Sequence, residues 1–268
     1  MKDKTNGKGQ MSKGKNGRET ICRLLHPLCL LSFAICLRSS ALAQASPSSE
    51  TAANPAGAVV QLLAIGPGAG DKNQECAATG ILVNEDGVIL TNAHVVEDAR
   101  RCLAGTSGAK IVAKLARPGA RTATGISCDV LALDELHDLA LLRTERPLPP
   151  DAARSYALLD GREVAAGTAV AVTGHSAFAW QATTQKGTIL RRTLLPLSDT
   201  SAEKSEVMIL DIPLQRGASG SPVYLDSGAV VGVVSRQNPS RPSETVAVPI
   251  GYAIELLKRK GLRWHGSP

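Results

Sequence analysis

A succession of short aliphatic and β-branched runs, separated by turn residues, restricts the fold of this chain more than any other feature. Gly, Asn and Asp stand between the runs, as in "TGILVNEDGVILT". This pattern predicts short strands in an all-β barrel or sandwich. Aromatic residues make up only 3% of the chain, so the cores must be aliphatic. The expected strands fall in two series, 58–66, 79–83, 88–96, 110–116, 128–134 and 139–143, then 168–174, 187–192, 206–214, 221–226, 229–235 and 244–250.

The two series predict two halves joined by the Pro-rich stretch "ERPLPPDAARS". Only "GYAIELLKRK", residues 251–260, has helical periodicity, with Ala253, Ile254 and Leu257 on one face. The expected division is a flexible lead-in at 44–57, a first half at 58–145, a connector at 146–155, a second half with the helix at 156–261, and a tail at 262–268.

The net positive charge of the chain comes from residues 1–43. The formal net charge is +6, and this leader holds eight Lys or Arg against two acidic residues. The remainder therefore carries equal numbers of basic and acidic residues. Composition gives no electrostatic reason to expect nucleic-acid binding.

Residues 1–43 also have the order of a signal peptide. A basic stretch precedes the apolar run 24–37, and small residues follow around Ala41 and Ala43. The run is short for a bilayer span, so we expect cleavage, export to the periplasm or the extracellular space, and no stable membrane insertion afterwards. An uncleaved membrane anchor is the alternative.

Three cysteines remain after the leader, Cys76, Cys102 and Cys128. In an oxidising compartment they allow one disulfide and one free thiol. No CxxC or HxxxH spacing occurs, and we expect no metal and no other cofactor.

Three polar residues stand at the ends of predicted strands. His94 follows an apolar run in "ILTNAHVV", Asp138 precedes one in "ELHDLALLR", and Ser219 precedes another in "RGASGSPV". Each residue alone also fits a turn or a strand end. Together they supply a base, an orienting acid and a nucleophile, which hydroxyl activation requires. Their order is that of chymotrypsin-like enzymes, and Ser221 departs from the Gly-x-Ser-x-Gly elbow of α/β-hydrolases.

The blocks "TGILVNEDGVILTNAHVVED", "HDLALLR" and "LDIPLQRGASGSPV" resemble the catalytic blocks of trypsin-like serine peptidases, and "TNAHVV" resembles the bacterial HtrA-like branch. The resemblance covers about 59–261. It implies two antiparallel six-stranded β-barrels of the chymotrypsin type, with the active site between them. It also implies His94 as general base, Asp138 as orienting acid and Ser219 as nucleophile. The N–H groups of Gly217 and Ser219 would then form the oxyanion hole.

The same resemblance implies that the Ser235 hydroxyl supports the triad carboxylate, although Ser235 also fits a strand end. Ala218 stands where zymogen-activated relatives have Asp and HtrA-like proteins have Asn, and Ser221 replaces a Gly. We expect Ser221 to place a side chain beside the cleft, where it would perturb Gly217. Few residues follow Gly261, so we expect no PDZ domain.

The primary specificity pocket is expected to be uncharged. Pro213 lies six residues before Ser219, and we expect Pro213, Leu214 and Ser235 to line the pocket. We expect Asp211 to be structural, with a pocket-lining Asp211 as the alternative. An unpaired cationic substrate side chain would be excluded there, which predicts cleavage after small or aliphatic residues.

Three further expectations concern the surroundings of the site. Cys76 and Cys102 should pair, because their segments should both flank the His94 loop. We expect His137 at the surface and His175 in an exposed loop.

Two functions fit the sequence. The first is an exported serine endopeptidase that forms an acyl-enzyme on Ser219 and acts on peptides or unfolded proteins. The second is a catalytically silent double barrel that holds peptides or a partner protein. The complete set of His94, Asp138 and Ser219 favours the enzyme.

Overall fold

The computed structural model describes residues 55–65, 76–104, 110–115, 124–150, 152, 155–176, 181–198 and 202–266, within a folded unit spanning Ser46–Pro268. The predicted signal peptide and most of the lead-in lie outside the described residues. The lead-in overlaps them at 55–57, in the short 3-10 helix η1 (Pro55–Ala58).

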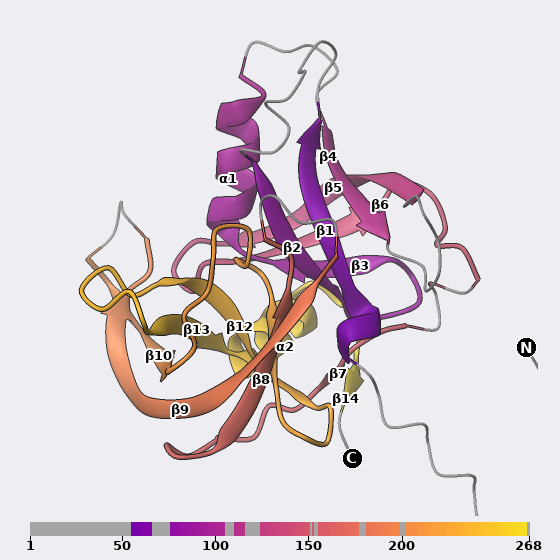
Figure 1. The fold of residues 1–268 in the computed structure, drawn as a ribbon. Coiled ribbons are helices and arrows are strands. Elements are labelled where there is room, and N and C mark those ends of the chain that lie inside the picture. Colours follow the sequence, from indigo (N-terminus) through magenta and orange to yellow (C-terminus); the bar gives the residue numbers. More distant parts are fainter. Residues whose placement is uncertain are drawn as a thin grey trace, which may run out of the picture. The chain divides into compact units, whose positions relative to one another are not determined.

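The first half forms a closed six-stranded barrel, with strand order β1-β2-β3-β6-β5-β4 and all pairs antiparallel. β1 pairs with both β2 and β4, which closes the sheet (Figure 1). Aliphatic side chains such as Leu62, Ile81 and Leu141 are fully buried inside it. The strands are β1 (Val59–Ile65), β2 (Ala77–Leu82), β3 (Val88–Thr91), β4 (Lys110–Leu115), β5 (Thr124–Asp134) and β6 (Leu139–Thr144).

The second half forms another six-stranded antiparallel barrel, β8-β9-β10-β13-β12-β11, which closes because β11 pairs with both β8 and β12. Two short strands, β7 and β14, extend the sheet from β12 in parallel. The predicted chymotrypsin-type double barrel is therefore confirmed. The strands are β7 (Leu158–Leu159), β8 (Ala169–Gly174), β9 (Thr183–Pro196), β10 (Lys204–Leu210), β11 (Pro222–Tyr224), β12 (Val230–Gln237), β13 (Thr245–Pro249) and β14 (His265–Gly266).

The expected strand 88–96 is interrupted by a helix that the sequence pattern did not predict. β3 ends at Thr91, and α1 (Ala93–Cys102) begins after Asn92. α1 buries Ala93, Val95, Val96 and Ala99 on one face. Because Val95 and Val96 are β-branched, this stretch fits a strand locally, and only the packing of the buried face distinguishes the helix.

The predicted C-terminal helix is α2 (Ile250–Arg259), and it connects the two barrels. It follows β13 directly, while Arg259 forms an ion pair of 2.6 Å with Asp134 of β5. Tyr252 stacks on His137, with the ring centroids 3.9 Å apart.

The segment expected to be a tail is bound to both barrels. β14 pairs with β7, and Asn84 Nδ2 donates to the carbonyl of Arg263 at 2.7 Å. His265 stacks on Tyr156 at a centroid distance of 3.9 Å. The described part of this segment therefore belongs to the folded unit.

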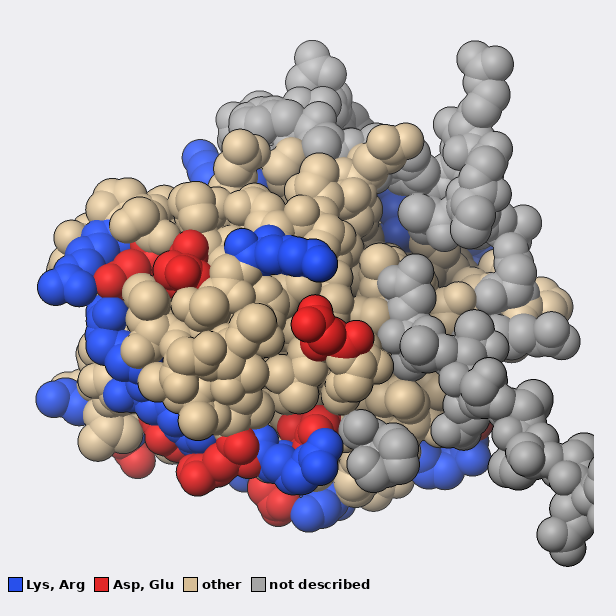
Figure 2. Space-filling view, turned by 60° about the horizontal axis from the view of Figure 1, so that its bottom comes forward, with Lys and Arg blue, Asp and Glu red and all other residues tan. Residues whose placement is uncertain are grey.

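Charged side chains of both signs are interspersed on the face seen in Figure 2, where basic and acidic residues adjoin along the rim. No broad area of that view is uniformly basic.

Within the described ranges, no helix is long and apolar enough to cross a membrane.

Candidate active site

Asp138 lies at the junction between the barrels, directly before β6. It is 4% exposed and has a positive φ of 51°, the sole non-glycine residue with positive φ in the described chain. Asn92 Nδ2 donates to the Asp138 main-chain carbonyl at 2.9 Å and fixes this unusual conformation. The Ser235 hydroxyl, from β12 in the other barrel, donates to Asp138 Oδ2 at 2.6 Å. The carboxylate is thus held from both barrels.

His94 stands in the first turn of α1 and faces Asp138. Its Nδ1 lies 2.9 Å from both carboxylate oxygens, and its main-chain N–H donates to Oδ1 at 3.0 Å. This contact orients the ring and leaves Nε2 to face the cleft. The His94 side chain is 35% exposed. Burial alone lowers the pKa of His94, but the hydrogen bond and the charge of Asp138 outweigh it, so the net pKa is raised.

Ser219 belongs to the loop between β10 and β11 and lines the same cleft as His94. Its hydroxyl donates to the main-chain carbonyl of Ser235 at 2.9 Å. Among the described residues, no hydrogen bond joins Ser219 Oγ to the imidazole. The structure brings the three predicted residues together but leaves the serine turned toward Ser235.

The loop that carries Ser219 has two glycines with positive φ, Gly217 at 96° and Gly220 at 85°. A Cβ on Gly220 would come within 1.9 Å of the Thr79 carbonyl oxygen, so this close approach requires glycine. In the described part of the chain, the N–H groups of Gly217 and Ser219 have no hydrogen-bond acceptor. Both are therefore available as donors to a ligand.

Thr79 of β2 fixes this loop from the opposite barrel, and the sequence analysis did not identify it. Its N–H donates to the Ser219 carbonyl and its hydroxyl donates to the Gly217 carbonyl, each at 2.9 Å. The His175 N–H donates in turn to Thr79 Oγ1 at 3.0 Å. The signal was the Thr in "TGILV", but the Gly217 carbonyl that its hydroxyl binds is 138 residues away in sequence.

Ser221, expected beside the cleft, is instead fully buried and does not line it. A Cβ on Gly174 would lie 1.9 Å from Ser221 Oγ, so the serine occupies space that glycine at 174 leaves open. Ser221 therefore packs against β8, and the expectation that its side chain stands at the cleft is wrong. Ala218 is 8% exposed, and its N–H donates to the Gln215 carbonyl at 3.2 Å.

The residues expected to line the primary pocket follow β10. Pro213 is exposed and Leu214 is half-buried, while Ser235 is buried beside Asp138. Asp211 accepts hydrogen bonds from the main-chain N–H of Thr188 and, at 3.0 Å, from its hydroxyl. The carboxylate of Asp211 is thus engaged by β9.

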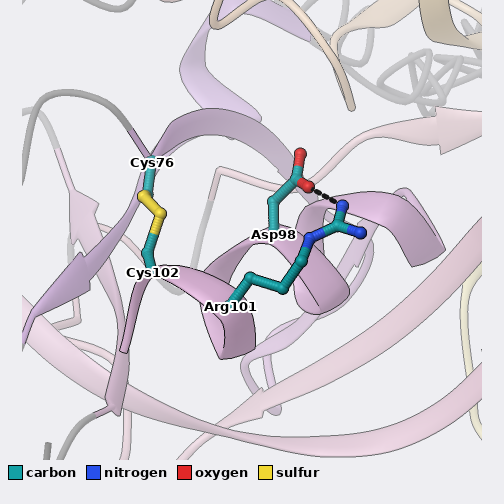
Figure 3. Close-up of a disulfide and its surroundings, with 4 residues drawn as sticks. All are labelled: Cys76, Asp98, Arg101 and Cys102. Atoms are coloured by element: carbon teal, nitrogen blue, oxygen red, sulfur yellow. Dashed lines mark hydrogen bonds and ion pairs between the residues drawn. A yellow bond between two sulfur atoms is a disulfide. The ribbon is translucent and has the colours of Figure 1, made fainter. Parts of the chain in front are cut away.

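A disulfide joins Cys76 to Cys102, as predicted, and connects the start of β2 to the end of α1 (Figure 3). It lines the cleft of about 370 Å³ that contains His94 and Ser219. Cys128 is free and buried, and burial raises the pKa of its thiol to about 11.

Neither of the two further histidines lies where it was expected. His137 is packed between Tyr252 and Asp134, with its Nδ1 2.9 Å from Asp134 Oδ1. His175 is only 2% exposed, because its segment is tied to Thr79 beneath the Ser219 loop. In the described part of the chain, no group of three or more His, Cys, Asp or Glu side chains could hold a metal ion.

A double β-barrel with a His–Asp pair and a serine at the junction defines the class of chymotrypsin-like proteins. The chain belongs to the trypsin-like peptidase domain family, whose model matches residues 78–233.

The relatives are proteases of the HtrA/DegP type. Serine protease HTRA2, mitochondrial, from Bos taurus is 30% identical over 218 residues, covering 79% of this chain and 43% of that protein. A probable periplasmic serine endoprotease DegP-like from Pseudomonas putida strain W619 is 27% identical over 201 residues, covering 72% and 37% respectively. The chain thus spans less than half the length of these curated relatives.

The fold is also found in solved structures. The Rv3671c protease from M. tuberculosis, in its active form, superposes with a TM-score of 0.59 at 20% identity, covering 83% of this chain and 91% of that one. At this identity the likeness shows the fold alone.

Proposed function

We propose that the protein is a serine endopeptidase in which Ser219 is the nucleophile, His94 the general base and Asp138 its orienting acid. The observation that carries this proposal is the His94–Asp138 contact at 2.9 Å in the same cleft as Ser219. A silent binding module would not require a buried carboxylate held by His94 and Ser235.

In the proposed reaction, rotation of the Ser219 side chain moves Oγ from the Ser235 carbonyl toward His94. Catalytic hydrogen bonds are often formed only when substrate is bound, so the present orientation is compatible with this step. His94 removes the hydroxyl proton as Oγ attacks the scissile carbonyl carbon. Asp138 holds the imidazole in the tautomer with its proton on Nδ1 and stabilises the imidazolium.

The negative charge that develops on the carbonyl oxygen would be stabilised by the N–H groups of Gly217 and Ser219. Neither group donates to a described acceptor, and Thr79 restrains the carbonyls of both residues. The proton on His94 then passes to the leaving amine, the C–N bond breaks, and water hydrolyses the acyl-enzyme by the same steps in reverse order.

For the residue before the scissile bond, we propose an uncharged pocket that includes Pro213, Leu214 and Ser235. Asp211 is bound by Thr188, so its carboxylate has partners other than a cationic substrate side chain. The proposed preference is for small or aliphatic residues.

We further propose export to the periplasm or the extracellular space and cleavage of peptides or unfolded proteins. The leader order and the Cys76–Cys102 disulfide support export. The Pseudomonas putida relative is named a periplasmic endoprotease.

The proposal is tested by digesting a peptide library with wild-type protein and Ser219→Ala in parallel, with mass spectrometric mapping of the cleaved bonds. We expect wild-type cleavage after Val, Ala, Ile or Leu and none by the variant. Equal cleavage by both proteins would reject Ser219 as the nucleophile. Dominant cleavage after Lys or Arg that Asp211→Ala removes would reject only the uncharged pocket.

A further inference from the structure

The cleft beside Ser219 has a composition that the catalytic roles do not explain. Its walls are formed by α1, by the Cys76–Cys102 disulfide and by the stretch from Arg216 to Ser219. None of the three residues proposed for the primary pocket lines it. Its volume of about 370 Å³ therefore lies on another side of the reaction centre.

The chemistry of the proposed reaction indicates which part of a substrate would lie there. His94 delivers its proton to the leaving amine, so the peptide that departs with this amine must start next to the imidazole. α1 extends from His94 along the cleft wall, with Val95, Asp98, Arg101 and Cys102 lining it. The residues that follow the scissile bond would therefore run along α1.

The charged side chains that line this cleft differ in whether they form an ion pair. Asp98 and Arg101, one turn apart on α1, form an ion pair (Figure 3). Arg216 is exposed, and no carboxylate of the described chain lies within ion-pair distance of it. Among the described residues that line the cleft, Asp98 carries a negative charge and Arg101 and Arg216 carry positive charges.

These charges act close to the reaction centre. The charge of Asp98 is among the causes that raise the pKa of His94. Arg216 directly precedes Gly217, one of the two proposed oxyanion donors. A guanidinium at this position can form a bidentate pair with a carboxylate, which a lysine ammonium cannot.

We propose that this cleft binds the one or two substrate residues after the scissile bond, and that Arg216 makes it prefer an acidic side chain there. The proposal deepens the peptidase function above and rests on it. Arg216 is thereby a specificity-determining residue, and the Asp98–Arg101 pair lines the same cleft.

The test uses peptides with one common sequence before the scissile bond and Asp, Asn or Lys at the first or second position after it. Asp and Asn have nearly the same shape, so their ratio of kcat/KM isolates charge. For the wild type we expect Asp to exceed Asn by about 2- to 5-fold, the range measured for exposed charge pairs. The ratio of kcat/KM for the Asp peptide to that for the Asn peptide should approach one at about 1 M salt, because exposed charges are then screened.

Variants at position 216 give the decisive comparison. Arg216→Gln should remove the preference for Asp, and Arg216→Glu should reverse it in favour of Lys. A role in loop structure alone would change all peptides equally and could not reverse the order. Arg100→Gln is the matched control, since Arg100 is exposed on the same helix but does not line the cleft.

Equal cleavage of all peptides by the wild type would overturn this inference while leaving the peptidase function intact. An unchanged Asp preference in Arg216→Gln would also overturn it. If the wild type cleaves no peptide and Ser219 fails to react with an acylating or phosphonylating probe, the proposed function falls and this inference falls with it.

Discussion

Thr79 donates its hydroxyl to the Gly217 carbonyl at 2.9 Å, so a strand of the first barrel holds the loop that carries Ser219 in the second. Thr79 is fully buried, and its N–H also binds the Ser219 carbonyl at 2.9 Å. These bonds restrain the carbonyls of Gly217 and Ser219, two residues that line the cleft and whose own N–H groups have no described acceptor. Thr79 is therefore expected to be a positioning residue for the oxyanion hole.

The first prediction concerns this hydroxyl. Thr79→Val keeps the shape of the side chain but removes the bond to Gly217, and we expect kcat to fall about 10-fold with little change in KM. Thr79→Ser should restore kcat. Thr173→Val is the control, because Thr173 is also a buried, hydrogen-bonded threonine but binds Thr184 and Tyr224 instead. A loss of kcat in Thr173→Val equal to that in Thr79→Val would indicate general destabilisation rather than positioning.

The second prediction concerns pH. Asp138 raises the pKa of His94 above the ordinary value for histidine. The imidazole therefore becomes a neutral base at a higher pH than an unperturbed histidine does. The acid limb of kcat/KM should accordingly have its midpoint above 6.5. Asp138→Asn removes the charge, so the midpoint should move to lower pH, and the plateau should fall by about 10⁴-fold because the tautomer is wrong. A pH profile with the same midpoint in both proteins would contradict the assignment of the limb to His94.

The third prediction concerns the contact between Ser221 and Gly174. Gly174→Ala places a Cβ within 1.9 Å of Ser221 Oγ, and we expect it to lower the free energy of unfolding by about 1–3 kcal/mol. Combining it with Ser221→Gly should recover part of this loss, because the clashing atom is removed. The measurement is denaturant unfolding of both single variants and the double variant. Strictly additive effects would show that the two positions do not interact.

The fourth prediction concerns the disulfide. Cys76 and Cys102 are 26 residues apart, and closing a loop of this length stabilises a fold by about 3 kcal/mol. The double variant Cys76→Ser, Cys102→Ser should unfold at lower temperature. Reductant should lower the melting temperature of the wild type but not of this variant, since Cys128 is unpaired in both. Equal sensitivity of the two proteins to reductant would contradict a stabilising role for the bond.

The parts of the fold that the sequence predicted are those with local signals. Strand periodicity, turn residues and the three sequence blocks around His94, Asp138 and Ser219 are each contained in short stretches, and the structure places these three residues together at the junction of two barrels. The helix α1 was missed because Val95 and Val96 in its first turn are β-branched and fit a strand until the buried face of the helix is known.

The rest of the site depends on contacts between distant segments. Ser221 was expected at the cleft because the motif gives no sign of its contact with Gly174. The support from Thr79 was invisible for the same reason, since a buried threonine does not reveal its partner. His175 was expected in an exposed loop, but its contact with Thr79 lies beneath the nucleophile loop.

Activation of Ser219 by His94 can be measured by labelling with a fluorophosphonate probe. Wild-type protein, Ser219→Ala and His94→Ala would be labelled under identical conditions, with circular dichroism to verify folding and mass spectrometry to locate the adduct. We expect one adduct on Ser219 in the wild type, none in Ser219→Ala and strongly slowed labelling in His94→Ala. Folded wild-type protein that remains unlabelled, or labelling at an unchanged rate in His94→Ala, would contradict this activation.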